Sequence, residues 1–144
     1  MTRSDDGSAL VEFSWLAIIL MIPLIWVVLA AFEMQQGAFG VSGAARAAGR
    51  AYSLAPDDAT GRARARAAVR QTLADQGLEG EPFDLVITCE RPGVDGTCHS
   101  SGAVATVRVE SRVELPMMPS ILGGQAPGLS LDGSHTVPYG TYRP

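Results

Sequence analysis

The stretch FSWLAIILMIPLIWVVLAAF, residues 13–32, decides the fold of the N-terminal part of this chain. It contains no charged side chain, and about 20 apolar residues are enough for a helix to span the hydrocarbon core of a bilayer. We therefore predict a membrane-spanning helix here. A proline removes one backbone hydrogen bond and favours a kink, which neighbouring helices in a membrane can accommodate. The residues that mark this predicted span are Phe13, Trp15, Pro23, Trp26 and Phe32.

A lone carboxylate, Glu12, stands directly before this run and five residues after Gly7. A carboxylate costs about 2 to 3 kcal/mol at the centre of a spanning helix and less near its end, so it usually has a partner. If the chain were cut after Gly7, the new ammonium group of Ser8 could be neutralised by Glu12 of a neighbouring subunit or of the same chain. The plain alternative is a glutamate at the border of an ordinary, uncleaved anchor.

The segment from Gly7 to Phe13, which follows a short polar leader, resembles a prepilin cleavage site. The sequence of residues 9–13, ALVEF, is similar to that of the TadE/TadF group of minor pseudopilins, which belong to tight-adherence (Tad) pili. The resemblance covers roughly the first third of the chain. It implies that a prepilin peptidase, a membrane aspartyl peptidase, cuts between Gly7 and Ser8, and that Glu12 sets the register between subunits. The partners it implies are other pilin or pseudopilin subunits and the pilus assembly platform.

Two signals complicate the placement of the N-terminus. Val28-Leu29-Ala30 could serve as the cleavage site of a secretory signal peptide, but the apolar run is long for such a peptide and Glu12 interrupts its start. The positive-inside rule, taken literally, places the C-terminus in the cytoplasm, because Arg3 precedes the run while Arg46 and Arg50 follow it.

The two cysteines favour the opposite topology. Cys89 and Cys98 flank the turn-rich segment 91–97 between strand-like runs, so they could close a hairpin with a disulfide. Such a bond stabilises by about 2 to 3 kcal/mol and persists in an oxidising compartment, which predicts an extracytoplasmic C-terminal domain. A metal site formed by both cysteines and His99 is the alternative. It lacks the second ligand pair that structural zinc prefers, so we predict no metal and no cofactor.

Residues 33–53 favour a continuation of the first helix to about Ser53. Small residues are frequent from Gly37 to Gly49, and they suit either a helical bundle or a stretch laid on the chain's own domain with a break at the glycines. A second helix is predicted with Asp57 or Asp58 as its N-cap and Gly77 as its stop. Its apolar face would comprise Ala65, Ala68, Val69 and Leu73, and its arginine row, which could be a solvated face or bind an acidic neighbour or anionic headgroups, comprises Arg62, Arg66 and Arg70.

The remaining chain alternates in the manner of antiparallel strands over 83–90, 103–115 and, more weakly, 129–137. Val107, Val109, Val113 and Leu115 should face a core that the second helix covers, and residues 106, 108, 110, 112 and 114 should face solvent. His135 would be a packed edge residue. We predict that segment 116–124 is either a loop packed on the core or an adaptable contact surface. We predict that Tyr139 to Pro144 form a loose tail.

These elements predict an α+β protein in three parts: a leader over 1–7, a transmembrane and protruding helix over 8–54, and a small extracytoplasmic domain over 55–144. The net charge of −4 gives no indication of nucleic-acid binding. The sequence shows no spaced nucleophile, base and carboxylate and no phosphate-binding glycine loop, so we predict neither an enzyme nor a small-molecule substrate. The expected location is the inner membrane, with one span, and a surface pilus after assembly.

Overall fold

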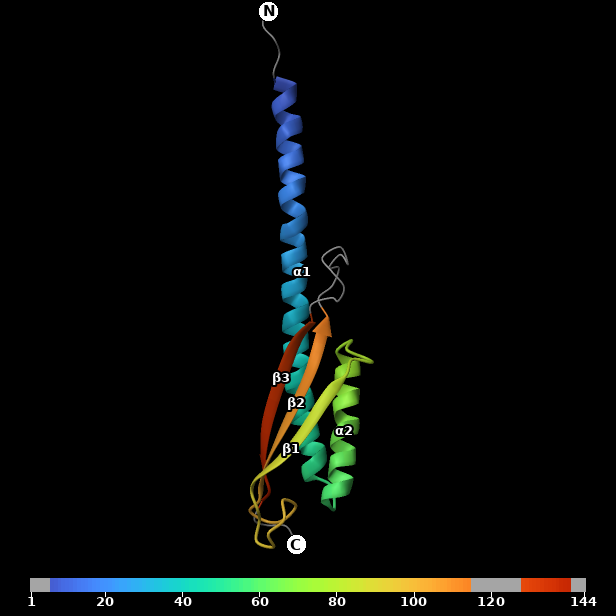
Figure 1. The fold of residues 1–144 in the computed structure, drawn as a ribbon, viewed down its shortest axis with the longest axis vertical. Coiled ribbons are helices and arrows are strands. Elements are labelled where there is room, and N and C mark those ends of the chain that lie inside the picture. The colour runs from blue at the N-terminus through green and yellow to red at the C-terminus, as the bar shows by residue number, and fades with distance from the viewer. Residues whose placement is uncertain (1–5, 115–127, 141–144) are drawn as a thin grey trace, which may run out of the picture. The chain divides into compact units, whose positions relative to one another are not determined.

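The computed structural model describes residues 6–114 and 128–140 and has the α+β architecture that the sequence predicts (Figure 1). The elements in chain order are α1 (Asp6–Ser53), α2 (Asp58–Asp75), β1 (Phe83–Arg91), β2 (Val104–Glu114) and β3 (Gly128–Pro138). The chain divides into two compact units, Met1–Glu33 and Met34–Pro144, and α1 contributes to both. The two units are described separately below.

The first unit is the apolar part of α1. Its large side chains are exposed, for example Phe13 at 72% and Trp15 at 64%. The backbone stays helical at Pro23, and the Ser14 hydroxyl donates a hydrogen bond of 2.8 Å to the Leu10 carbonyl oxygen, so this hydroxyl needs no water. Within the described ranges α1 is the one helix long and apolar enough to cross a membrane. It is compatible with a single-pass membrane anchor.

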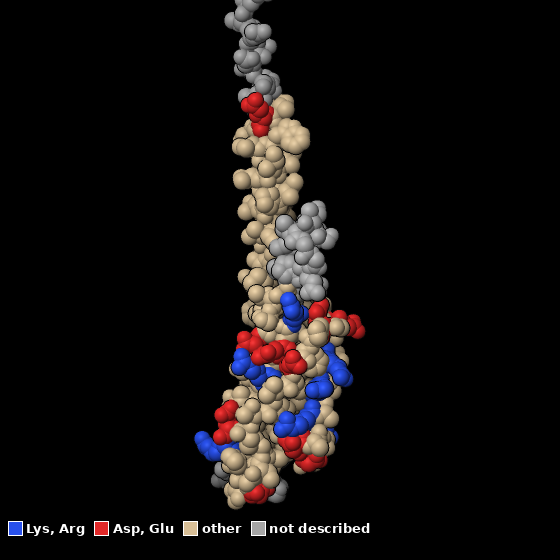
Figure 2. Space-filling model, viewed as in Figure 1, with Lys and Arg blue, Asp and Glu red and all other residues tan. Residues whose placement is uncertain are grey.

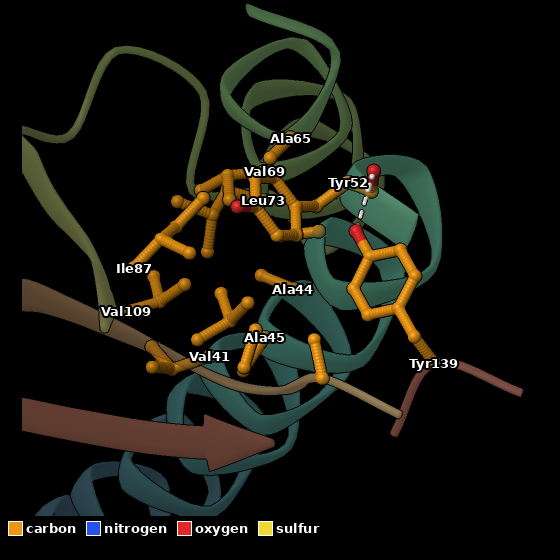
Figure 3. Packing of buried hydrophobic residues seen from close by; sticks show 14 residues of the cluster. Val41, Ala44, Ala45, Tyr52, Ala65, Val69, Leu73, Ile87, Val109 and Tyr139 are labelled. Carbon is orange, nitrogen blue, oxygen red and sulfur yellow. Dashed lines mark hydrogen bonds between the residues drawn. The ribbon is translucent and has the colours of Figure 1, made fainter. Parts of the chain in front are cut away.

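The second unit is a three-stranded antiparallel sheet in the order β1-β2-β3, with helices on one face. The central strand β2 pairs Val107 with Ile87 of β1 and with His135 of β3. The second part of α1, together with α2, supplies the other side of the core (Figure 3). The inward residues of β2, among them Val107 and Val109, are fully buried, while Arg108 and Glu110 between them are exposed, as the alternating pattern predicts.

The small residues of α1 pack on the chain's own domain. Ala44, Ala45 and Ala48 are fully buried, and the helix continues through Gly37, Gly40 and Gly43 without the break that one alternative required. The compact unit that contains the sheet begins at Met34, so it includes the part of α1 that was predicted to protrude from the membrane. The reason is that this part of α1 forms a layer of the core, which hydropathy along the sequence does not reveal.

Helix α2 follows its sequence signals closely. Asp57 is the N-cap: its side chain accepts a 2.9 Å hydrogen bond from the Thr60 backbone N–H. The helix ends at Asp75, and Gly77 follows with a φ of +76°, a left-handed conformation that favours glycine. The buried residues are Gly61, Ala65, Val69 and Leu73, whereas the predicted Ala68 is only half-buried.

The third strand is packed as predicted, with His135 half-buried at the position where β3 meets α1. A Cβ placed on Gly49 of α1 would lie 2.7 Å from Val137 Cγ2 and 3.0 Å from His135 Cδ2, so a glycine is needed for this close approach. Leu115 and the predicted loop 116–124 lie outside the described residues, as does the side chain of Val113.

Gly133 of β3 makes the closest backbone approach to α1 and generates a prediction. A Cβ there would lie 2.8 Å from the Val41 carbonyl oxygen and 3.0 Å from Ser42 Cα, which are backbone atoms that cannot rotate away. Gly133→Ala is therefore expected to lower the free energy of unfolding by about 1 to 3 kcal/mol, measured by circular dichroism melts of the detergent-solubilised protein.

Gly43→Ala is the matched control. Its Cβ would meet Thr72 Cγ2 at 3.6 Å, an ordinary contact. Alanine favours a helix interior over glycine by about 1 kcal/mol, so this variant should be more stable than the wild type. Equal melting temperatures for the Gly133 and Gly43 variants would contradict the close approach of Gly133 to the α1 backbone.

Candidate functional site

The residues of the predicted processing site lie at the start of α1, which begins at Asp6. Gly7 and Ser8 fall within its first turn, and Glu12 follows Ser8 by four residues. Residues four apart lie on the same face of a helix, with Cβ atoms about 6 Å apart. A cut after Gly7 would leave a new α-ammonium on Ser8, about one helical turn from Glu12, whose side chain leans toward the N-terminus of the helix.

The surface around Glu12 is apolar and exposed. Leu10, Val11 and Phe13 all present more than half of their surface. Figure 2 shows an almost unbroken uncharged surface along this part of α1. Phe32 is exposed as well, whereas Trp26 is half-buried. A surface of this kind is stable in lipid or against other apolar helices, not in water.

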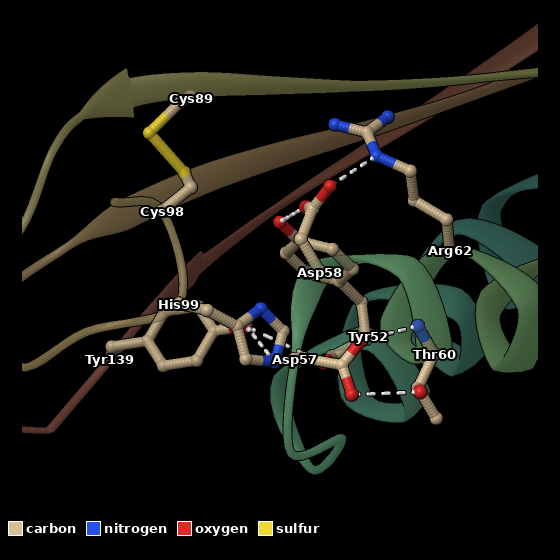
Figure 4. Close-up of polar contacts among 9 residues, drawn as sticks. All are labelled: Tyr52, Asp57, Asp58, Thr60, Arg62, Cys89, Cys98, His99 and Tyr139. Carbon is tan, nitrogen blue, oxygen red and sulfur yellow. Dashed lines mark hydrogen bonds and ion pairs between the residues drawn. A yellow bond between two sulfur atoms is a disulfide. The ribbon is translucent and has the colours of Figure 1, made fainter. Parts of the chain in front are cut away.

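A polar cluster, formed by Tyr52, Asp58, Arg62, His99 and Tyr139, lies where α1 turns into α2 (Figure 4). The Tyr52 hydroxyl donates a hydrogen bond to one Asp58 carboxylate oxygen, and Arg62 Nε donates to the other at 2.8 Å. These bonds, that of Tyr52 first, hold the pKa of Asp58 below its usual range. Burial raises the pKa of Tyr52. Asp58 and Tyr52 are thus held as a carboxylate and a neutral phenol.

His99 joins the loop between β1 and β2 to this cluster. Its Nε2 lies 2.9 Å from the Ala55 carbonyl oxygen, and its Nδ1 lies 3.1 Å from the Tyr139 hydroxyl. The ring packs edge-on against Tyr52 at a centroid distance of 4.9 Å. Gly61 makes room for both rings, because a Cβ there would lie 2.8 Å from Tyr52 and 3.1 Å from His99.

The disulfide between Cys89 and Cys98 holds the backbone next to His99. Its Cα atoms are 5.6 Å apart, and the bond joins the end of β1 to the loop that leads into β2. The predicted pairing is thereby confirmed, and both cysteines of the alternative metal site are used in it. No group of three or more potential metal ligands is found in the described part of the chain.

Sequence reasoning missed the cluster, and at Tyr139 it was wrong. We expected a loose tail from this residue, but only 6% of Tyr139 is exposed, and its backbone N–H donates to the Ala103 carbonyl oxygen at 2.8 Å. A signal was present: Leu131, His135, Val137 and Tyr139 keep the period of two that marks the inner face of a strand. Residues 141–144 are outside the described ranges.

The cluster holds the domain together. Its members come from α1, α2, the β1–β2 loop and the end of β3, and its hydroxyl, imidazole and carboxylate groups are engaged with one another or with backbone carbonyls. No protein-family model, no curated protein and no solved structure matches this chain. Inferences about function therefore rest on the residues themselves.

The disulfide generates a prediction about this cluster. Replacing both Cys89 and Cys98 by serine should lower the free energy of unfolding by about 2 to 3 kcal/mol, because the denatured chain regains the freedom of the closed loop. The His99 ring resonances should shift at the same time, since its loop is no longer held. A reducing agent should reproduce both effects in the wild type and change nothing in the double variant. A wild-type melt that is insensitive to reduction would contradict this role.

Proposed function

We propose that this chain is a minor pseudopilin that a prepilin peptidase cuts after Gly7, and that it acts in the assembly of a Tad-type adhesive pilus or is incorporated into it. The observation that carries the proposal is the placement of Gly7, Ser8 and Glu12 at the start of a single helix whose next 20 or so residues are apolar and exposed. The resemblance of residues 9–13 to TadE/TadF-like sequences supports the same assignment.

The proposed mechanism follows from the apolar environment that the surface of this helix requires. Before assembly, the subunit lies in the inner membrane and lipid covers its apolar surface. On assembly, the helices of pilin or pseudopilin neighbours replace this lipid. The Ser8 ammonium and the Glu12 carboxylate neutralise each other across that contact, which favours one register over others. The assembly platform then moves the subunit as part of a fibre.

The domain from Met34 onward is proposed to be extracytoplasmic. A disulfide persists in an oxidising compartment, and we give this argument more weight than the arginines that follow the span. We propose a structural subunit rather than an enzyme, because the groups of its polar cluster are engaged in holding elements together. The rival function is an uncleaved, membrane-anchored binding module, for which the same domain would serve.

Processing is tested by Gly7→Leu in the native host. A bulky residue should block the peptidase, so the membrane fraction should contain chain starting at Met1 or Thr2 in place of chain starting at Ser8, as read by intact mass and N-terminal sequencing. Pilus formation should fail with it.

Ala30→Leu is the matched control, because it would block a signal peptidase cut after Ala30 and leave the Gly7 site intact. This variant should still begin at Ser8. A wild-type chain that begins at Met1 or Thr2 would support the uncleaved anchor. A wild-type chain that begins at Ala31 and is found in the medium would support a secreted domain. Either result would refute the processing step.

Register is tested by Glu12→Gln compared with Glu33→Gln, two exposed glutamates at opposite ends of the apolar run. Both variants should insert and be cleaved. Only the Glu12 variant should lose co-purification with pilus subunits, by about tenfold, since it alone loses the charge that faces the Ser8 ammonium. Equal losses in the two variants would show that Glu12 has no special role.

A further inference from the structure

Helix α2 and strand β1 leave open grooves between them on the domain surface. One is lined by Arg62, Arg66, Leu85 and Ile87, and the next by Arg70, by Phe83 and by two acidic residues, Glu79 and Glu81. The helix and the strand thus run antiparallel, with Arg62 beside Ile87 and Arg70 beside Phe83. The helix contributes alanines here, so Phe83 and Leu85 stay half-buried.

Two arginines of the row, Arg66 and Arg70, form no direct ion pair in the described part of the chain, although Glu79 and Glu81 line the same groove as Arg70. Arg62 is paired with Asp58 at 2.8 Å. Like charges four residues apart destabilise a helix, so the row is unfavourable for the isolated domain. It becomes favourable when carboxylates lie against it.

Strand β1 beside the row has a free edge. The sheet order is β1-β2-β3, so β1 pairs only with β2, and no other described strand pairs with the backbone N–H and C=O groups of its other edge. An extended segment that paired with this edge would lie about 4.8 Å from β1, and every second side chain would point to the side of the sheet where α2 lies.

The spacing of the two elements fits such a segment. Arginines at every fourth helix position recur about 6 Å apart along the axis, and alternate strand side chains recur about 6.7 Å apart. Carboxylates at alternate positions of an added strand would therefore meet Arg66 and Arg70 in succession. We propose that the edge of β1 beside this arginine row binds an extended acidic segment of another protein, with acidic residues at every second position.

A second copy of this chain does not fit the same edge. Antiparallel pairing of two β1 strands would bring two α2 helices side by side and place their arginine rows against each other, and it would set Asp84 opposite Glu90 about a centre at Ile87. A bilayer surface fits less well than a strand, because it cannot pair with the backbone of β1. The inference does not depend on the pilus assignment and applies equally to an uncleaved anchor.

The test uses the full-length protein in a zwitterionic detergent and a labelled synthetic peptide as long as β1, 9 residues, in which glutamate alternates with threonine. Binding is followed by fluorescence anisotropy. The double variant Arg66→Glu/Arg70→Glu should weaken binding by at least about tenfold, and Arg66→Gln/Arg70→Gln should weaken it less. Arg64→Glu is the matched control, because Arg64 is exposed on the same helix but lines neither groove.

Further readouts locate the bound peptide. Hydrogen exchange should show new protection at amides of β1 and none at the free edge of β3. A peptide with lysine in place of glutamate should not bind, and one with the glutamates adjacent should bind more weakly. Thermal melts confirm that each variant is folded.

Four results would overturn the proposal: no binding of the alternating peptide, equal losses for Arg64→Glu and the double variant, unchanged protection at β1, or binding of the protein to phosphatidylglycerol vesicles through Arg66 and Arg70 without binding of the peptide. The last result would assign the row to a lipid surface.

Discussion

Close contact between the second part of α1 and the sheet is the constraint on which the domain depends. Alanines of α1, such as Ala44 and Ala48, are fully buried, and Gly133 of β3 lies directly against the α1 backbone at Val41. Small residues allow helix and sheet to approach until backbone atoms are in contact. A larger residue at these positions would separate the layers and also displace α2, whose Gln76 carbonyl oxygen accepts a hydrogen bond from Gln36 of α1.

One helix therefore satisfies two different environments. Up to Phe32 its side chains are large, apolar and exposed, as lipid or neighbouring apolar helices require. From Val41 to Ala48 the inward side chains are small and buried, as close contact with a sheet requires. The change occurs within one continuous helix, α1, which runs from Asp6 to Ser53.

Sequence patterns within short segments predicted most of the fold. The features that the sequence did not predict depend on contacts between residues that are far apart in the chain. The cap at Asp57, the stop at Gly77 and the alternation in β2 each depend on a few neighbouring residues, and these predictions were confirmed. The disulfide was predicted because its two cysteines flank a turn-rich segment between strand-like runs. The contact of His99 with Ala55 joins residues 44 apart, and that of Tyr139 with the Tyr52 carbonyl oxygen joins residues 87 apart. No pattern within one segment reports such a contact, although the period of two in β3 extended to Tyr139 and could have indicated its burial. The processing site and the role of Glu12 stay predictions.

The short span of the disulfide has a mechanical consequence. The bond joins residues nine apart within one connection, so it adds no covalent link between α1 and the sheet. A pulling force that enters the domain through α1 is opposed by side-chain packing, by the few bonds of the Tyr52 cluster and by the Ser53 to Asp58 connection into α2. The bond restricts the motion of one loop, but it does not oppose the separation of α1 from the sheet under load. The small-residue packing against Gly133 is therefore part of the resistance of the domain to tension.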